Sequence, residues 1–160
     1  MRRLSLLFAF LFAAPVFVAG PAAAAGPYDL SAEGNARFLA DFAALPGVTK
    51  LPDGVLVRVV DTGKGQTPLG RQDTVEVEYK GWMVDGKVFD QTKPGQSHPF
   101  VLANLIAGWT AALLKMKTGD QWQIVIPAAL AYGAEGRPPV IPPNQTLVFM
   151  VKLDSVAYAP

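Results

Sequence analysis

The chain of 160 residues contains no cysteine and only one histidine, His98. The lack of cysteine excludes disulfides, thiolate nucleophiles, cysteine-based zinc sites and lipid attachment through cysteine. A catalytic triad or a multi-histidine metal site would depend on one imidazole, and His98 lies between Ser97 and Pro99 in an expected loop. Nucleophilic and metal chemistry are therefore not expected, and no cofactor is predicted.

Positive and negative side chains nearly balance, so the formal net charge is only +1. Such a balance gives no basic surface for a nucleic-acid partner or an anionic membrane. Apolar residues make up 51% of the chain and charged residues 17%. This composition is sufficient for a buried core, and the length favours one domain.

Residues 1–25 have the pattern of a secretory signal peptide. Arg2 and Arg3 precede an apolar run over residues 4–18, and Ala23 to Ala25 supply small residues for cleavage. The run is shorter than the roughly 20 residues that span a bilayer, so cleavage after Ala25 is favoured over a membrane anchor. We therefore expect an exported protein, periplasmic or alternatively released to the medium, without a membrane attachment after cleavage.

Residues 26–45 are expected to form a short lead and one amphipathic helix. Ser31 is a suitable N-cap, and Glu33 lies near the positive end of the helix dipole. Apolar side chains recur at helical spacing from Phe38 to Leu45 before Pro46 ends the pattern. The apolar face would pack either on the side of the domain or against a dimer partner.

Beyond Gly54 the apolar period changes to that of β-strands. Residues 74–80 alternate cleanly, with Val75, Val77 and Tyr79 on one face. Asp85-Gly86 predicts a hairpin turn, and Asn104 predicts the cap of a helix that runs to about Met116. The same criteria predict strands at 55–60, 82–84, 87–89, 121–126 and 146–154, and loops at 91–99 and 133–145. The fold class is thus α+β, an antiparallel sheet with one helix packed on it.

Aromatic side chains in separate segments are the remaining candidates for a site. Several lie at the ends of predicted elements, and Tyr132 opens the Pro- and Gly-rich loop at 133–145. A loop of that length in a compact domain is usually functional, and apolar pockets are the usual binding sites. The candidates are Tyr79, Phe89, Phe100, Trp109, Tyr132 and Phe149.

Four blocks of sequence resemble the FKBP-type peptidyl-prolyl cis-trans isomerase family. Residues 77–90 (VEYKGWMVDGKVFD) resemble V-x-Y-x-G-x-x-x-D-G-x-x-F-D, and residues 105–109 (LIAGW) resemble V-I-x-G-W. Residues 131–134 (AYGA) and 141–149 (IPPNQTLVF) resemble A-Y-G-x and I-P-P-x-x-x-L-V-F. The resemblance covers about residues 46–156. It implies an isomerase domain over 46–160, with a twisted antiparallel sheet wrapped around one short helix.

The resemblance also assigns roles to individual residues. Trp109 would be the floor of a prolyl pocket, and Tyr79, Phe89, Phe100 and Phe149 would be its walls. Asp90 would be the polar group inside the pocket, and the Tyr132 hydroxyl and the Ile106 N–H would hold substrate carbonyls. Leu105 and Ile106 would form the rim, and Val140 and Ile141 would line the loop. The implied partners are proline-containing polypeptides and macrolides of the FK type.

Two departures from the family pattern concern the pocket. Arg137 stands where the family often has histidine, and Lys93-Pro94-Gly95 occupies the region where well-known eukaryotic members have an arginine.

Residues 34–48 are similar to the exported macrophage-infectivity-potentiator branch, whose longer members dimerise through an N-terminal helical domain. Only one helix of that domain is expected here, which predicts a monomer.

The expected function is acceleration of X-Pro bond rotation during the folding of exported proteins. One alternative is a non-catalytic binding module that uses the same groove or the N-terminal helix. The other is a carrier for a small apolar ligand, which the pocket chemistry alone would allow.

Overall fold

The computed structural model describes residues 27–160, so the signal peptide expected at 1–25 lies outside the described residues. The first helix, α1, spans Ala32–Ala43. The Ser31 hydroxyl accepts a hydrogen bond from the Gly34 N–H at 3.0 Å, and Glu33 lies in the first turn. The predicted helix and its N-cap are therefore confirmed, because both depend on local sequence.

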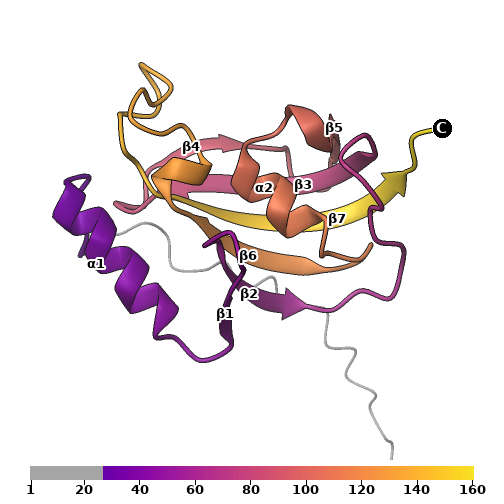
Figure 1. Ribbon diagram of the computed structural model, residues 1–160, viewed down its shortest axis with the longest axis horizontal. Coiled ribbons are helices and arrows are strands. Elements are labelled where there is room, and N and C mark those ends of the chain that lie inside the picture. The colour runs from indigo at the N-terminus through magenta and orange to yellow at the C-terminus, as the bar shows by residue number, and fades with distance from the viewer. Residues whose placement is uncertain (1–26) are drawn as a thin grey trace, which may run out of the picture.

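One antiparallel sheet of seven strands forms the body of the domain (Figure 1). The strand order is β1-β2-β6-β7-β3-β4, and β5 also pairs with β3. The predicted strands are present, but those expected at 74–80 and 82–84 form one continuous strand, and the short strand at 48–50 was not predicted. The strands are β1 (Val48–Lys50), β2 (Leu56–Asp61), β3 (Thr74–Met83), β4 (Val88–Gln91), β5 (His98–Val101), β6 (Gln121–Ile126) and β7 (Leu147–Ala157).

Strand β3 lies beside β7 and carries both β4 and β5 on its other edge. Its Val75 and Val77 are buried and Glu76 is exposed, as the alternation predicts. The loop predicted at 91–99 is wrong at its end, because His98–Val101 forms β5, with Pro99 opposite Glu76. Proline is tolerated on an edge strand. The presence of Pro99 favoured a loop in the sequence, although the segment forms an edge strand.

The helix in the middle of the chain is shorter than predicted. A 3-10 turn, η1, spans Leu102–Asn104, and α2 spans Ala107–Leu113. Leu105 and Ile106 between them have extended backbones, so Ile106 rather than Asn104 caps α2. The prediction of a helix from Asn104 to Met116 was therefore wrong at both ends. A second 3-10 turn, η2, spans Ala128–Leu130 and leads into the loop at 133–145.

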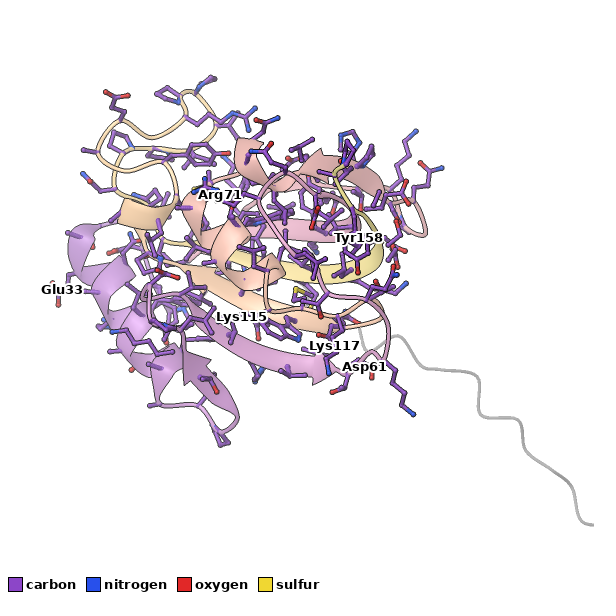
Figure 2. The ribbon with its side chains drawn as sticks, turned by 45° about the vertical axis from the view of Figure 1, so that its right-hand side comes forward. Glu33, Asp61, Arg71, Lys115, Lys117 and Tyr158 are labelled. Carbon is purple, nitrogen blue, oxygen red and sulfur yellow. The ribbon has the colours of Figure 1, made fainter. Side chains whose placement is uncertain are left out.

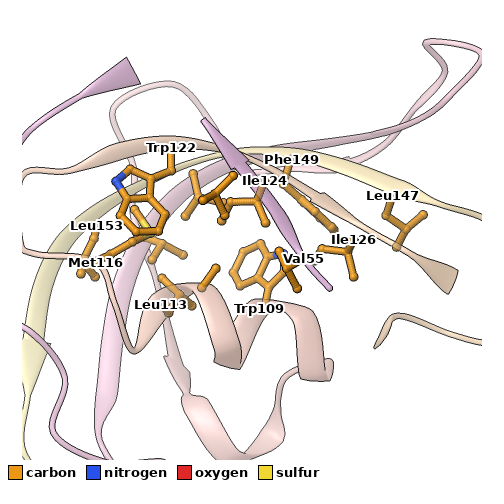
Figure 3. Packing of buried hydrophobic residues seen from close by; sticks show 14 of the residues in the cluster. Val55, Trp109, Leu113, Met116, Trp122, Ile124, Ile126, Leu147, Phe149 and Leu153 are labelled. Carbon is orange, nitrogen blue, oxygen red and sulfur yellow. The ribbon is translucent and has the colours of Figure 1, made fainter. Parts of the chain in front are cut away.

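The two faces of the sheet bury different apolar clusters. The main core lies between α2 and the inner face, where Leu113, Ile124 and Leu153 are fully buried (Figure 3). On the outer face, Phe42 of α1 packs with Leu56, Val125 and Val148. The apolar face of α1 thus packs on its own domain, which is the first of the two alternatives for this helix.

Charged side chains are scattered over the surface. Figure 2 shows Glu33 on α1 at one side of the molecule and Asp61 and Lys117 at the other. Among residues 27–160, no helix has the length and apolarity to cross a membrane.

Candidate functional site

Trp109 is the centre of an aromatic cluster beside the inner face of the sheet. Its ring is edge-on to Tyr79 at 5.1 Å, to Phe100 at 5.8 Å and to Phe149 at 5.2 Å between centroids. Phe89 continues the cluster, edge-on to Phe149 at 5.6 Å. Edge-to-face contacts of this kind fix ring orientations as well as adding packing energy. The five predicted pocket aromatics therefore come together in one place.

Five elements supply these rings, and the sheet register explains how they meet. Trp109 comes from α2, Tyr79 from β3 and Phe149 from β7, while Phe89 and Phe100 lie on the edge strands β4 and β5. Four of these elements are strands of one sheet, so the cluster depends on the pairing of distant segments.

Gly81 provides the space that the cluster needs. It lies opposite Phe149 on β7 and opposite Asp90 on β4. A Cβ atom at this position would lie 2.7 Å from the Phe149 ring and 2.8 Å from the Phe89 ring. Only a residue without a side chain therefore permits both rings to approach β3. Sequence reasoning used Gly81 as part of a motif and missed this steric role.

Asp90 is held beside the cluster by Tyr79. The Tyr79 hydroxyl donates a hydrogen bond of 2.7 Å to the Asp90 carboxylate. Burial, and secondly this hydrogen bond, raises the pKa of Tyr79 well above its usual range. Asp90 itself is exposed, and among the described residues its carboxylate forms no salt bridge. The Tyr79 hydroxyl is thus the side-chain donor that the structure gives to the Asp90 carboxylate.

The rim of the cluster is the extended segment before α2. Leu105 and Ile106 are half-buried and pack against the main core. Among the described residues, the Ile106 N–H donates to no acceptor. A free N–H at the start of a helix is a ready donor for a carbonyl oxygen. The Thr110 hydroxyl donates to the Leu102 carbonyl at 2.8 Å and joins α2 to η1 beneath this rim.

The loop at 133–145 brings two more of the predicted residues to the core. Tyr132 is half-buried against the main cluster, and Ile141 is fully buried within it. Val140, next to Ile141 in the chain, is 48% exposed and is not part of the buried core. The guanidinium of Arg137 lies 5.9 Å from the centre of the Tyr132 ring, so the departure at Arg137 places a cation over a predicted substrate contact.

A groove of about 300 Å³ flanks the cluster on the side of the loop that follows β4. Tyr79 and Phe100 form its wall toward the aromatic cluster, and His98 stacks on Phe100 with 4.7 Å between ring centroids. The remaining lining is polar, so the groove passes from an aromatic wall to a polar one. The lining residues are Tyr79, Gln91, Thr92, Lys93, Gln96, Ser97, His98 and Phe100.

Residues 65–154 match the family described as FKBP-type peptidyl-prolyl cis-trans isomerase. The chain is 43% identical over 129 residues to Outer membrane protein MIP of Legionella longbeachae, covering 80% of this chain and 54% of that protein. It is 46% identical over 120 residues to FKBP-type peptidyl-prolyl cis-trans isomerase FkpA of Escherichia coli strain K12, covering 74% of this chain and 44% of that protein. The chain thus spans about half the length of the curated relatives that it matches.

Solved structures agree with the sequence matches. A crystal structure of a peptidyl-prolyl cis-trans isomerase from Pseudomonas syringae pv. tomato is similar with a TM-score of 0.74 at 42% identity, covering 78% of this chain and 92% of that one. The crystal structure of FkpA from Escherichia coli gives a TM-score of 0.75 at 43% identity, covering 80% of this chain and 60% of that one. The predicted α+β architecture is confirmed, and the chain belongs to the FKBP-type peptidyl-prolyl cis-trans isomerase family.

Proposed function

We propose that the protein is an active peptidyl-prolyl cis-trans isomerase whose pocket is the aromatic cluster around Trp109. The observation that supports it most is the convergence of four aromatic rings from four strands on the buried indole of Trp109. Rotation about a peptide bond requires no catalytic nucleophile, so an aromatic pocket is sufficient for this reaction.

The physical reason lies in amide resonance. Rotation about a peptide bond has a barrier of about 18–20 kcal/mol, because resonance gives the C–N bond partial double-bond character. The twisted transition state loses that resonance and is less polar than the planar ground state. An apolar, water-poor pocket therefore favours the twisted state, and every 1.36 kcal/mol of such preference gives roughly a tenfold gain in rate.

In the proposed binding mode, the prolyl ring rests on Trp109 between the walls formed by Tyr79, Phe89, Phe100 and Phe149. The Ile106 N–H and the Tyr132 hydroxyl donate to carbonyl oxygens of the substrate. Leu105 contributes to the rim, and Val140 and Ile141 cover the pocket from the loop.

Asp90 acts electrostatically in this proposal and transfers no proton. Its hydrogen bond from Tyr79 fixes both groups at the wall of the pocket. The carboxylate then orients the substrate carbonyl or the neighbouring rings by its negative charge.

The proposed role is to assist the folding of exported proteins. X-Pro bonds are the natural substrates, because their cis form is populated and their isomerisation limits folding. The signal-like segment at 1–25 supports a periplasmic location, with release to the medium as the alternative. Macrolides of the FK type would occupy the same pocket.

The test is catalysis of cis-to-trans isomerisation of short X-Pro peptides, with and without such a macrolide. We expect acceleration by the wild-type protein, inhibition by the macrolide and a reduced kcat/KM for Asp90→Asn. Full activity of Asp90→Asn would remove the electrostatic role of Asp90. A folded wild-type protein that accelerates no X-Pro peptide would refute the isomerase proposal and favour a binding module.

A further inference from the structure

Asn35 on α1 is a buried polar residue that the prolyl pocket does not use. It is only 6% exposed, although it belongs to a surface helix whose other inward contacts are apolar. Its side-chain N–H groups donate to the Ser31 carbonyl at 2.9 Å and to the Gln145 side-chain oxygen at 3.2 Å. Its side-chain oxygen accepts from the Thr146 N–H at 2.7 Å. A buried amide with all its groups paired gives orientation as well as stability, because breaking one bond leaves another group unsatisfied.

Gln145 completes the contact from the other side. It is 5% exposed, and its side-chain N–H groups donate to the Leu30 carbonyl at 3.1 Å and to the Pro143 carbonyl at 2.9 Å. The two amides therefore join the start of α1 to the segment where the loop at 133–145 becomes β7. Figure 1 shows this end of α1 near the loop. We refer to Asn35, Gln145 and Thr146 together as the amide clamp.

The clamp lies at the base of the loop that carries the proposed substrate contacts. The Asn144 N–H donates to the Gly133 carbonyl at 2.8 Å and closes the loop one residue before the clamp. Within the loop, Arg137 and Ile141 bond to each other through their backbones. The position of Ile141 and the direction in which Tyr132 faces thus depend on a closed loop that is anchored at Gln145.

We infer that Asn35 is a positioning residue, which holds the loop over the prolyl pocket through the amide clamp. This inference rests on the proposed function for its effect on catalysis. It assigns a role in the isomerase site to α1, which lies outside residues 65–154 that match the family.

The test compares Asn35→Ala with Phe42→Ala. Phe42 lies on the same helix, is 5% exposed and packs on the outer face of the sheet, away from the clamp. Both substitutions should lower the stability of the protein. Only Asn35→Ala should lower kcat/KM on X-Pro peptides, by on the order of tenfold at a temperature where both variants are folded, because small displacements of contact groups reduce rates steeply.

Amide hydrogen exchange of the loop separates positioning from loss of stability. The N–H groups of Gly136, Arg137, Ile141 and Asn144 are hydrogen-bonded within the loop, and they should exchange faster in Asn35→Ala than in Phe42→Ala. Gln145→Met keeps the bond between Asn35 and Thr146 and should give the same pattern more weakly. Gln145→Met also tests the inference if Asn35→Ala fails to fold.

Wild-type kcat/KM and wild-type loop exchange in the clamp variants would overturn the inference, as would an equal loss of activity in Phe42→Ala. An inactive wild-type protein would instead refute the proposed function. In that case loop exchange alone decides whether Asn35 holds the loop.

Discussion

Trp109 and Trp122 are two buried indoles in one apolar core, yet only Trp109 belongs to the aromatic cluster. Trp109 is 4% exposed and Trp122 is 9% exposed. Figure 3 shows Trp122 beside Met116 and Leu153, while Trp109 points from α2 toward the sheet near Phe149. The pair therefore offers a matched comparison of pocket and core.

Trp109→Phe should lower kcat/KM on X-Pro peptides by at least about tenfold, which corresponds to about 1.4 kcal/mol of transition-state stabilisation. The smaller ring would leave the floor of the pocket incomplete. Trp122→Phe should lower the free energy of unfolding by about 0.5–3 kcal/mol and change kcat/KM little. Steady-state kinetics and urea unfolding measure both quantities, and equal kinetic losses in the two variants would contradict a specific role for Trp109.

The hydroxyl of Tyr79 should remain protonated at alkaline pH. Its pKa is raised by burial and by the hydrogen bond to Asp90, so the neutral form persists above the usual tyrosine pKa of about 10. The kcat/KM of the wild-type protein should therefore not fall at about pH 10 through ionisation of Tyr79. A decline near that pH in the wild type that is absent in Tyr79→Phe would show an unperturbed hydroxyl.

At the scale of elements, the rim of the pocket depends on the join between η1 and α2. Thr110 is buried, and its hydroxyl bonds to the Leu102 carbonyl. Thr110→Val keeps the shape and removes this bond, which should lower the free energy of unfolding by about 1 kcal/mol and reduce kcat/KM by loosening Leu105 and Ile106.

Thr118→Val is the control for this prediction, because the Thr118 hydroxyl bonds to the Gln66 carbonyl at an exposed site. Chemical denaturation and peptide kinetics should separate the two variants. Wild-type kinetics in Thr110→Val would show that the rim does not need this bond.

Elements with a strong local signal were predictable from the sequence. The Ser31 cap and the alternation in β3 depend on neighbouring residues alone. The start of α2 was not predictable, because the extended backbone at Leu105 and Ile106 lies between a 3-10 turn and a helix that are joined by a tertiary hydrogen bond. Strand β5 was not predicted because it contains Pro99. Proline fits in this strand only because the strand lies at an edge of the sheet, and the sequence does not show that position.

The part of the site that lies within the family motifs was predictable from the sequence. The aromatic candidates were named from their places at the ends of elements, the resemblance to the family assigned their roles, and the structure brings five of them together. The amide clamp was not predictable, because Asn35 and Gln145 are 110 residues apart in the chain and neither belongs to a periodic pattern. The role of Gly81 required the register of three strands.

At the scale of the whole molecule, α1 uses its apolar face within its own chain. Phe38, Leu39 and Phe42 belong to the cluster on the outer face of the sheet, so little apolar surface of this helix remains for a partner. We therefore predict a monomer in solution, measurable by sedimentation equilibrium. A stable dimer whose association weakens in Phe38→Ala would contradict this prediction and favour pairing through α1.

The central claim is that X-Pro rotation takes place in the aromatic cluster around Trp109. The most direct test is exchange NMR of an X-Pro peptide with the purified protein, recorded before and after saturation with a macrolide of the FK type. We predict that catalytic amounts of protein increase the cis-trans exchange rate and that the macrolide abolishes the increase while shifting the resonances of Trp109 and Tyr79. Exchange at the uncatalysed rate, or catalysis that persists with the pocket filled, would contradict the claim.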